Sequence, residues 1–255
     1  MLLLLLLLTA LSFSQEALTR VGLQSARVVL ERGKEYYLKL TGGSKLTCAD
    51  CHGPDGESLK GAYARMPRFY TDLGRVADAD LRVLSCLRQY LRLEDERLKS
   101  RERELVVPLV GFVASLSNGE LVFVELRHPE EKRLYELGRT VWYRRSGATD
   151  FSCALCHERL AGKQFFAEVL PAPIPDRAPA RYPAYSVKRD ELLTLEDKLR
   201  DCFERYLLYD PKKGRFSFES RVRKPPYYVE ELIALELFLM HSVNGSTLSV
   251  PGVIK

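Results

Sequence analysis

The sequence is poor in histidine and methionine, and it lacks the features of a nucleic-acid-binding protein. Only four histidines and three methionines occur among its 255 residues. No run of lysine and arginine interleaved with aromatic residues is present, so we do not expect nucleic acid as a partner despite the net charge of +5. This moderate excess of positive charge instead favours an anionic substrate or an acidic partner.

Long apolar runs are also absent, except at the N-terminus. The stretch MLLLLLLLTALSFSQ has about 13 apolar residues followed by small ones, which is typical of a secretory signal peptide and too short to span a bilayer. It contains no lysine or arginine, so a retained membrane anchor is the alternative. We predict that residues 1–14 are a signal peptide, and that the mature chain has no membrane span and lies outside the cytoplasm.

Four of the six cysteines belong to two copies of one motif, CADCH at 48–52 and CALCH at 153–157. C-x-x-C-H is the attachment signature of c-type haem, in which two thiols bind the vinyl groups and the histidine binds the iron. A thioredoxin-like dithiol is the competing interpretation, but it explains neither the histidine nor the duplication. We therefore predict two c-type haems, anchored by Cys48, Cys51, Cys153 and Cys156, with His52 and His157 as proximal ligands.

The repeat continues upstream of each motif. RGKEYYLKLTGGSKLTCADCH aligns without a gap with LGRTVWYRRSGATDFSCALCH, so that Gly33 matches Gly138 and Tyr37 matches Trp142. A glycine four residues before a large aromatic places both on one helix face. We expect a second helix to cross closely at each glycine.

The repeat also continues downstream of each motif. SCLRQYL at 85–91 matches DCFERYL at 201–207, and each half ends in an apolar helical stretch closed by Asn-Gly. The predicted fold is therefore all-α, with two tandem class I cytochrome c-like domains at 15–127 and 128–255. The join falls near RHPEEKR, where a proline separates an apolar run from a charged helix start. Each domain is small, and a covalently held haem would supply much of its core.

Few side chains remain that could bind the sixth position of a haem iron. The histidines and methionines outside the two motifs have no counterpart in the other half, and we expect packed methionines and surface or capping histidines: Met66, Met240, His128 and His241.

Cys86 and Cys202, in contrast, occupy equivalent positions in the two halves. A Cys86–Cys202 disulfide and a buried inert thiol are the alternatives. The repetition favours two His/Cys-ligated haems, with Cys86 and Cys202 as the sulfur ligands. A thiolate ligand lowers the reduction potential of haem, and the iron keeps the sulfur deprotonated.

Basic residues accompany Cys202. Lys198 precedes it by four residues and Arg205 follows it by three, which puts both on the Cys202 side of a helix. Such cations would lower the pKa of the thiol and attract an anion such as thiosulfate. The alternative is that they form the solvated face of an amphipathic helix.

The motifs, the two lone cysteines and the segments YPAY (182–185), TLEDKLRDC (194–202) and SVNGSTLSVPGV together resemble the SoxA family. SoxA is the dihaem subunit of the SoxAX cytochrome of periplasmic sulfur oxidation. The resemblance implies an L-cysteine S-thiosulfotransferase that joins thiosulfate oxidatively to a cysteine of the SoxYZ carrier, and passes electrons through haem to a SoxX-like monohaem subunit. It implies a periplasmic heterodimer whose second haem is active.

The same resemblance implies a catalytic role for Cys202. It also assigns a substrate-positioning role to Lys198, although the family usually has arginine there and lysine lacks the planar fork that binds an oxyanion at two points. Two other functions stay open. One is a TsdA-type thiosulfate dehydrogenase that forms tetrathionate, and the other is a plain dihaem electron-transfer cytochrome.

Overall fold

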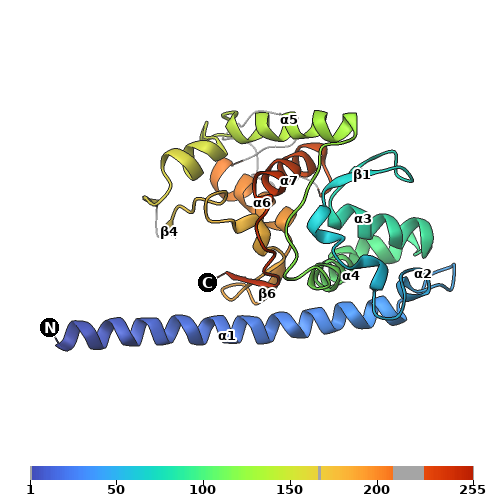
Figure 1. The fold of residues 1–255 in the computed structure, drawn as a ribbon, viewed down its shortest axis with the longest axis horizontal. Helices are drawn as coiled ribbons and strands as arrows, with labels where there is room; N and C mark the ends of the chain where they lie inside the picture. Colours follow the sequence, from blue (N-terminus) through green and yellow to red (C-terminus); the bar gives the residue numbers. More distant parts are fainter. Residues whose placement is uncertain (1, 166–167, 209–226, 255) are drawn as a thin grey trace.

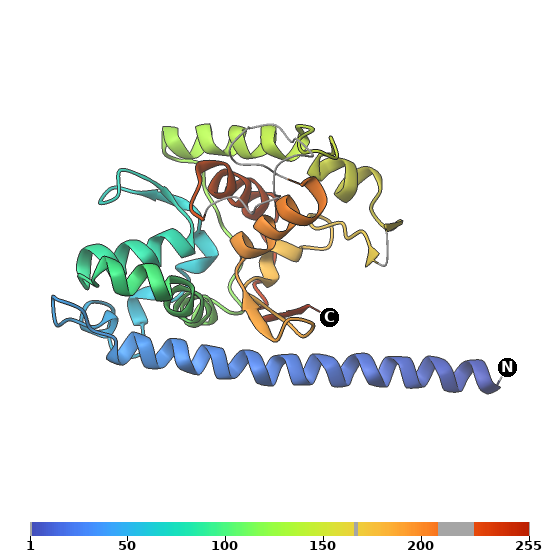
Figure 2. The same ribbon diagram turned by 180° about the vertical axis from the view of Figure 1, so that it is seen from behind.

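The structure is a computed structural model that describes residues 2–165, 168–208 and 227–254. Its longest elements are the helices α1 (Leu2–Lys39), α4 (Asp95–Ser115), α5 (Pro129–Tyr143) and α7 (Glu230–Ser242). Helix α1 runs along one side of the molecule, and α5 lies on the opposite side, next to α7 (Figures 1 and 2). Within the described part of the chain, no helix has an apolar stretch of the length that a bilayer crossing requires.

The first predicted helix crossing is confirmed. Gly33 of α1 lies against α4 so closely that a Cβ there would be 2.0 Å from the carbonyl oxygen of Pro108. One turn later, Tyr37 packs on Phe112 of α4 with ring centroids 5.0 Å apart. The glycine thus brings the two backbones together, and the aromatic residue fills the space beside the contact.

The second crossing repeats the first. A Cβ on Gly138 of α5 would lie 2.0 Å from the carbonyl oxygen of Ala234 on α7. Trp142 packs on Phe238 with ring centroids 6.0 Å apart. The same pairing of glycine and aromatic residue therefore builds both helix pairs.

We expect Gly138→Ala to destabilise the protein by about 2 kcal/mol, because overpacking costs about 1–3 kcal/mol and the clash here is with backbone. The better helix propensity of alanine, worth about 1 kcal/mol, offsets only part of this cost. Urea unfolding of the holoprotein measures the effect. The matched control is Arg139→Ala at the exposed neighbouring position, which should change stability by less than about 0.5 kcal/mol. Equal stability of the two variants would contradict the tight crossing.

The all-α prediction needs one correction, because short strands accompany the helices. Two antiparallel hairpins pair β1 (Arg68–Tyr70) with β2 (Arg75–Ala77), and β5 (Ala184–Ser186) with β6 (Glu191–Leu193). Strand β7 (Gly252–Ile254) adds to β5 in parallel. A further small pair joins β3 (Gln164–Phe165) and β4 (Glu168–Val169). Strands of two or three residues are too short to show an alternating apolar pattern in sequence.

Each larger hairpin leads into a short helix that ends at, or directly before, one of the lone cysteines. Helix α3 (Ala79–Ser85) begins after the capping residue Asp78, and α6 (Leu195–Cys202) begins after Thr194. Each helix continues into one turn of π-helix, η3 (Cys86–Tyr90) or η6 (Phe203–Leu207). The remaining short elements are α2 (Cys48–His52), η1 (Glu57–Leu59), η2 (Tyr63–Arg65), η4 (Leu155–Arg159) and η5 (Ala178–Arg181).

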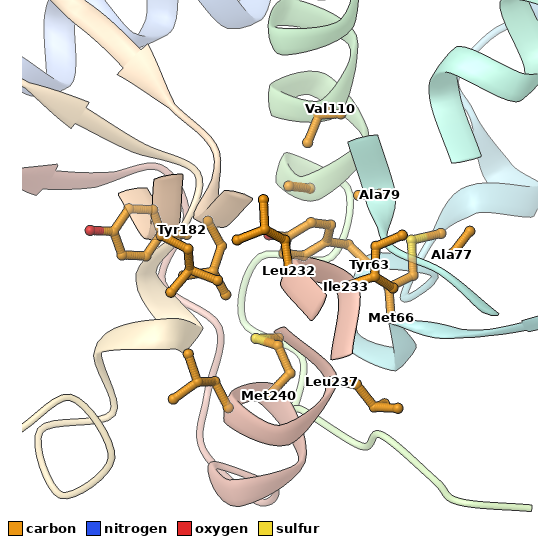
Figure 3. Packing of buried hydrophobic residues seen from close by; sticks show 14 of the residues in the cluster. Tyr63, Met66, Ala77, Ala79, Val110, Tyr182, Leu232, Ile233, Leu237 and Met240 are labelled. Carbon is orange, nitrogen blue, oxygen red and sulfur yellow. The ribbon is translucent and has the colours of Figure 1, made fainter. Parts of the chain in front are cut away.

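The apolar core is continuous between the first and second halves of the chain. Tyr63 and Met66 of the first half lie next to Leu232 and Ile233 of α7 (Figure 3). Helix α1 also packs against β5 and β7, which belong to the second half. The two halves therefore pack as one body.

Candidate functional site

The first C-x-x-C-H motif forms the short helix α2, which is closed by a capping box. Thr47 Oγ1 accepts a hydrogen bond from the Asp50 amide, and the Asp50 carboxylate accepts one from the Thr47 amide. His52 Nδ1 lies 3.0 Å from Ser58 Oγ, which leaves Nε2 available to a metal ion. The hydroxyl of Tyr37 donates to the carbonyl of Gly53, the residue after the histidine. The helix crossing thus also positions the motif.

The second motif is held in a similar way. Trp142 Nε1 donates to the carboxylate of Glu158, again the residue after the histidine, at 2.6 Å. The Trp142 ring also stacks on His157 with centroids 5.8 Å apart. His157 Nδ1 donates to the carbonyl of Pro171 at 2.9 Å, because a carbonyl can only accept. In the neutral imidazole this hydrogen bond leaves Nε2 without a proton, as metal ligation requires. Pro171 belongs to the proline-rich loop LPAPIPDRAPARYPAY at 170–185, which thus orients the ligand.

In the first half, the motif faces a cavity of about 350 Å³. His52 lines it from α2 and Cys86 lines it from η3, while Tyr37, Leu87 and Leu109 contribute apolar walls. A histidine and a cysteine on separate elements that border one apolar space, next to the motif thiols, fit a covalently bound haem with two axial ligands. Met66 lines the same cavity, a placement that its sequence position gave no reason to expect.

The charge next to Cys86 is compensated. Arg82 Nη1 pairs with the carboxylate of Asp72 at 2.5 Å, and the hydroxyl of Tyr90 donates to the same carboxylate at 2.7 Å. The Arg82 guanidinium also lies 4.5 Å from the centre of the Tyr70 ring. Burial raises the pKa of the Cys86 thiol, and Arg82 opposes this shift. Arg82, the cation four residues before Cys86, is therefore neutralised by Asp72.

Cys202 lies near the motif cysteines of its own half. Burial raises the pKa of Cys153 to about 12, and the neighbouring Cys202 adds to that shift. Burial likewise raises the pKa of the Cys202 thiol, while Lys198 and Arg205 lower it. The predicted effect of the two cations is therefore confirmed, although desolvation outweighs it and the pKa of the thiol is raised overall. A bound metal ion would still deprotonate the sulfur.

Lys198 and Arg205 line one cavity of about 310 Å³, and Cys202 itself is not among its lining residues. Asp201 lines it as well, and its carboxylate pairs with Arg189. Lys198 forms no ion pair with any residue that the structure describes. Arg200, by contrast, stacks on the ring of Tyr227 away from this cavity. The second site therefore combines a cysteine with an uncompensated ammonium group.

The other sequence-based candidates pack as expected. His128 caps α5 by accepting a hydrogen bond from the Glu130 amide, and its ring stacks on Phe69 at 3.6 Å. His241 contacts Tyr135 edge-on, and Met240 is buried in the core. Cys86 and Cys202 form no disulfide with each other, so that alternative is wrong.

Comparison with known proteins identifies the chain. A family model described as the SoxA/TsdA cytochrome c domain matches residues 32–122. Two proteins of Hydrogenobacter thermophilus named L-cysteine S-thiosulfotransferase subunit SoxA are 36% and 34% identical to it. The alignments cover 93% of this chain in both cases, and 87% and 85% of the relatives. The crystal structure of SoxXA from P. pantotrophus has the same fold, with a TM-score of 0.73 and 24% identity over 91% of this chain and 79% of that one.

The fold, the C-x-x-C-H motifs and the family match define a c-type cytochrome, which binds haem covalently. Within that class, the chain belongs to the SoxA family.

Proposed function

We propose that this chain is the dihaem subunit of a periplasmic L-cysteine S-thiosulfotransferase. Its SoxA relatives carry that name, and they align with almost the whole chain. The observation that carries the proposal is the setting of Cys202, which lies near the second motif together with Lys198, a cation with no ion-pair partner in the described part of the chain. An exported chain with residues 1–14 as its leader fits this location.

We further propose two haems, one in each of the domains 15–127 and 128–255. Cys48 and Cys51 would anchor the first, and Cys153 and Cys156 the second. His52 with Cys86, and His157 with Cys202, would be the axial ligands. The free Nε2 atoms of both histidines and the position of Cys86 on the first cavity support these assignments.

A c-type haem supplies a one-electron acceptor whose potential a thiolate ligand keeps low. The protein contributes an anion-binding group and a sulfur atom in one place. Lys198 pairs with the sulfonate oxygens of thiosulfate and directs the outer sulfur toward Cys202. The overall reaction forms a sulfur–sulfur bond to the carrier cysteine, whose thiol loses its proton. Two electrons leave, so a cytochrome partner of higher potential is required.

That partner is proposed to be a SoxX-like monohaem subunit, as in the SoxXA complex whose fold this chain shares. The acceptor of the thiosulfate group is proposed to be a SoxYZ-like carrier protein. Both are expected to be obligatory for turnover, since the chain itself holds neither the carrier cysteine nor the final electron acceptor.

The test is an assay of the purified complex with thiosulfate, an oxidised acceptor cytochrome and a carrier protein that bears one cysteine. We expect a mass increase on the carrier that corresponds to one thiosulfonate group, and two electrons transferred per group. Omission of the carrier should stop electron transfer. Formation of tetrathionate without the carrier would instead assign the chain a thiosulfate dehydrogenase activity and refute the proposal.

A further inference from the structure

Cys86 and Cys202 follow the same sequence of elements, a hairpin and then a short helix. Equivalent positions in the two halves can therefore be compared directly. Both sites begin with a hairpin whose turn occupies 71–74 or 187–190, followed by a helix with the cysteine eight residues after its capping residue. The last turn residue has a positive φ in both, 64° at Gly74 and 56° at Asp190. The second and third turn residues are therefore equivalent in the two halves.

The charges at these equivalent turn positions are reversed. The first turn carries Asp72 and the second carries Lys188 in its place. Four residues after each capping residue lies a cation, Arg82 in α3 and Lys198 in α6. Asp72 neutralises Arg82, whereas Lys188 cannot neutralise Lys198 and lines the same cavity. The turn thus neutralises the helix cation in the first half and adds a second cation beside it in the second half.

The two halves also differ in charge at the third turn position. The first turn has Leu73, and the second has Arg189. Arg189 pairs with the carboxylate of Asp201, whose side chain is 3% exposed and precedes Cys202 directly. A buried carboxylate at this point would repel an anion, and Arg189 cancels its charge. The residue equivalent to Asp201 in the first half is Ser85, which needs no such partner.

The cavity reaches Asp201, the residue directly before Cys202, although Cys202 does not line it. Its lining carries four cations against one carboxylate, namely Lys188, Arg189, Lys198 and Arg205 against Asp201. We propose that the turn at 187–190 makes this cavity a binding site for a small sulfur oxyanion, with Lys188 as a binding cation and Arg189 as the positioning residue that neutralises Asp201. The inference deepens the proposed function and rests on it for the identity of the anion.

The test measures binding of thiosulfate to the oxidised holoprotein by calorimetry at low ionic strength, without carrier and without turnover. Lys188→Asp copies the charge of the first half, and it should weaken binding by about tenfold or more because it reverses a charge at the anion. The matched control is Lys132→Asp on α5, an exposed residue on the opposite side of the molecule from β6 (Figure 1). It makes the same change in net charge and should alter affinity by less than about twofold.

A rescue experiment separates the role of Arg189 from direct contact with the anion. Arg189→Met should weaken thiosulfate binding by about tenfold, because it leaves Asp201 uncompensated. Adding Asp201→Asn to the same chain should restore affinity to within about twofold of the original protein. Failure of this rescue, equal affinities of the Lys188 and Lys132 variants, or no measurable binding by the unsubstituted protein would each overturn the inference.

These outcomes are independent of the transferase assignment. Binding that depends on Lys188, without any conjugate formed on a carrier, would support the anion site and remove the proposed function. Conjugation that proceeds equally well in the Lys188 and Lys132 variants, with equal affinities, would keep the function and remove the inference.

Discussion

Replacing Cys202 by methionine is expected to lower the rate of thiosulfate transfer by more than about 1000-fold while haem stays attached. Attachment depends on the thiols of Cys153 and Cys156, which the substitution does not alter. Methionine provides a sulfur that can bind iron, but this sulfur is neutral and already carries two carbon substituents. It therefore raises the reduction potential and cannot form a bond to the outer sulfur of thiosulfate. Electron paramagnetic resonance of the purified protein would report the change of ligand, and the carrier assay would report the loss of transfer.

The matched control is Cys86→Met, the same change at the equivalent position of the first half. We expect this variant to show the spectroscopic change of one haem and to retain most of its transferase rate, since Arg82 at that site is already paired with Asp72. A second variant, Cys202→Ser, preserves the size of the side chain and guards against a packing effect of methionine. Full turnover by Cys202→Met, or equal losses in the Cys86 and Cys202 variants, would refute the assignment of the second site as the reactive one.

The helix crossings and the haem motifs were predictable because each is a local pattern with one physical explanation. A glycine four residues before an aromatic residue needs a close helix neighbour, and the structure provides Pro108 for Gly33 and Ala234 for Gly138. Helical spacing predicted that Lys198 and Arg205 lie on one side of the helix, and both line one cavity.

Other features depend on contacts between distant parts of the chain, which spacing does not reveal. Asp72 is ten residues from Arg82, and its pairing requires the hairpin to fold back on α3. The raised pKa of Cys202 is caused by burial, which the charges around it in the sequence could not indicate. The hairpins themselves were missed because strands of three residues have no recognisable period.

Arg103 of α4 forms ion pairs across the contact between the two halves of the chain. Its guanidinium pairs with Asp80 of α3 at 2.7 Å and with Asp197 of α6 at 2.6 Å. It also donates to Thr194 Oγ1 at 3.2 Å, and thus touches the first turns of both cysteine-bearing helices. The side chain of Asp80 is only 3% exposed, so this arginine compensates a buried charge.

More carboxyl groups surround the same contact. Asp78, Glu196 and Glu236 are all buried, and each has an oxygen atom without a hydrogen-bond partner among the described residues. Burial raises the pKa of Asp78 to about 7, and the neighbouring Asp80 adds to the shift. Burial also raises the pKa of Asp80, while Arg103 opposes that shift. Arg103 therefore reduces the free energy required to ionise these buried carboxyl groups.

Arg103→Met should lower the free energy of unfolding by about 3–5 kcal/mol at neutral pH, because it leaves Asp80 and Asp197 without their cation. The loss should shrink as the pH falls toward 4. Without Arg103, the folded-state pKa of Asp80 rises further above its unfolded value. When Asp80 is protonated, the folded variant no longer contains an uncompensated buried charge. The variant is therefore more stable at acidic pH, and it loses this stability as the pH rises through the folded-state pKa of Asp80. Urea unfolding of the holoprotein across this pH range measures the effect.

The control for this substitution is Arg133→Met on α5, whose guanidinium pairs with Glu130 and Glu230 on the surface and is 52% exposed. An exposed ion pair contributes about 0–1 kcal/mol, so this variant should lose little stability and show no recovery in acid. The pH dependence distinguishes a charge effect from a packing effect, since a cavity left by the shorter side chain would cost the same at every pH. If Arg103→Met lost the same stability at every pH, the ion pairs of Arg103 with Asp80 and Asp197 would not be the cause of the loss.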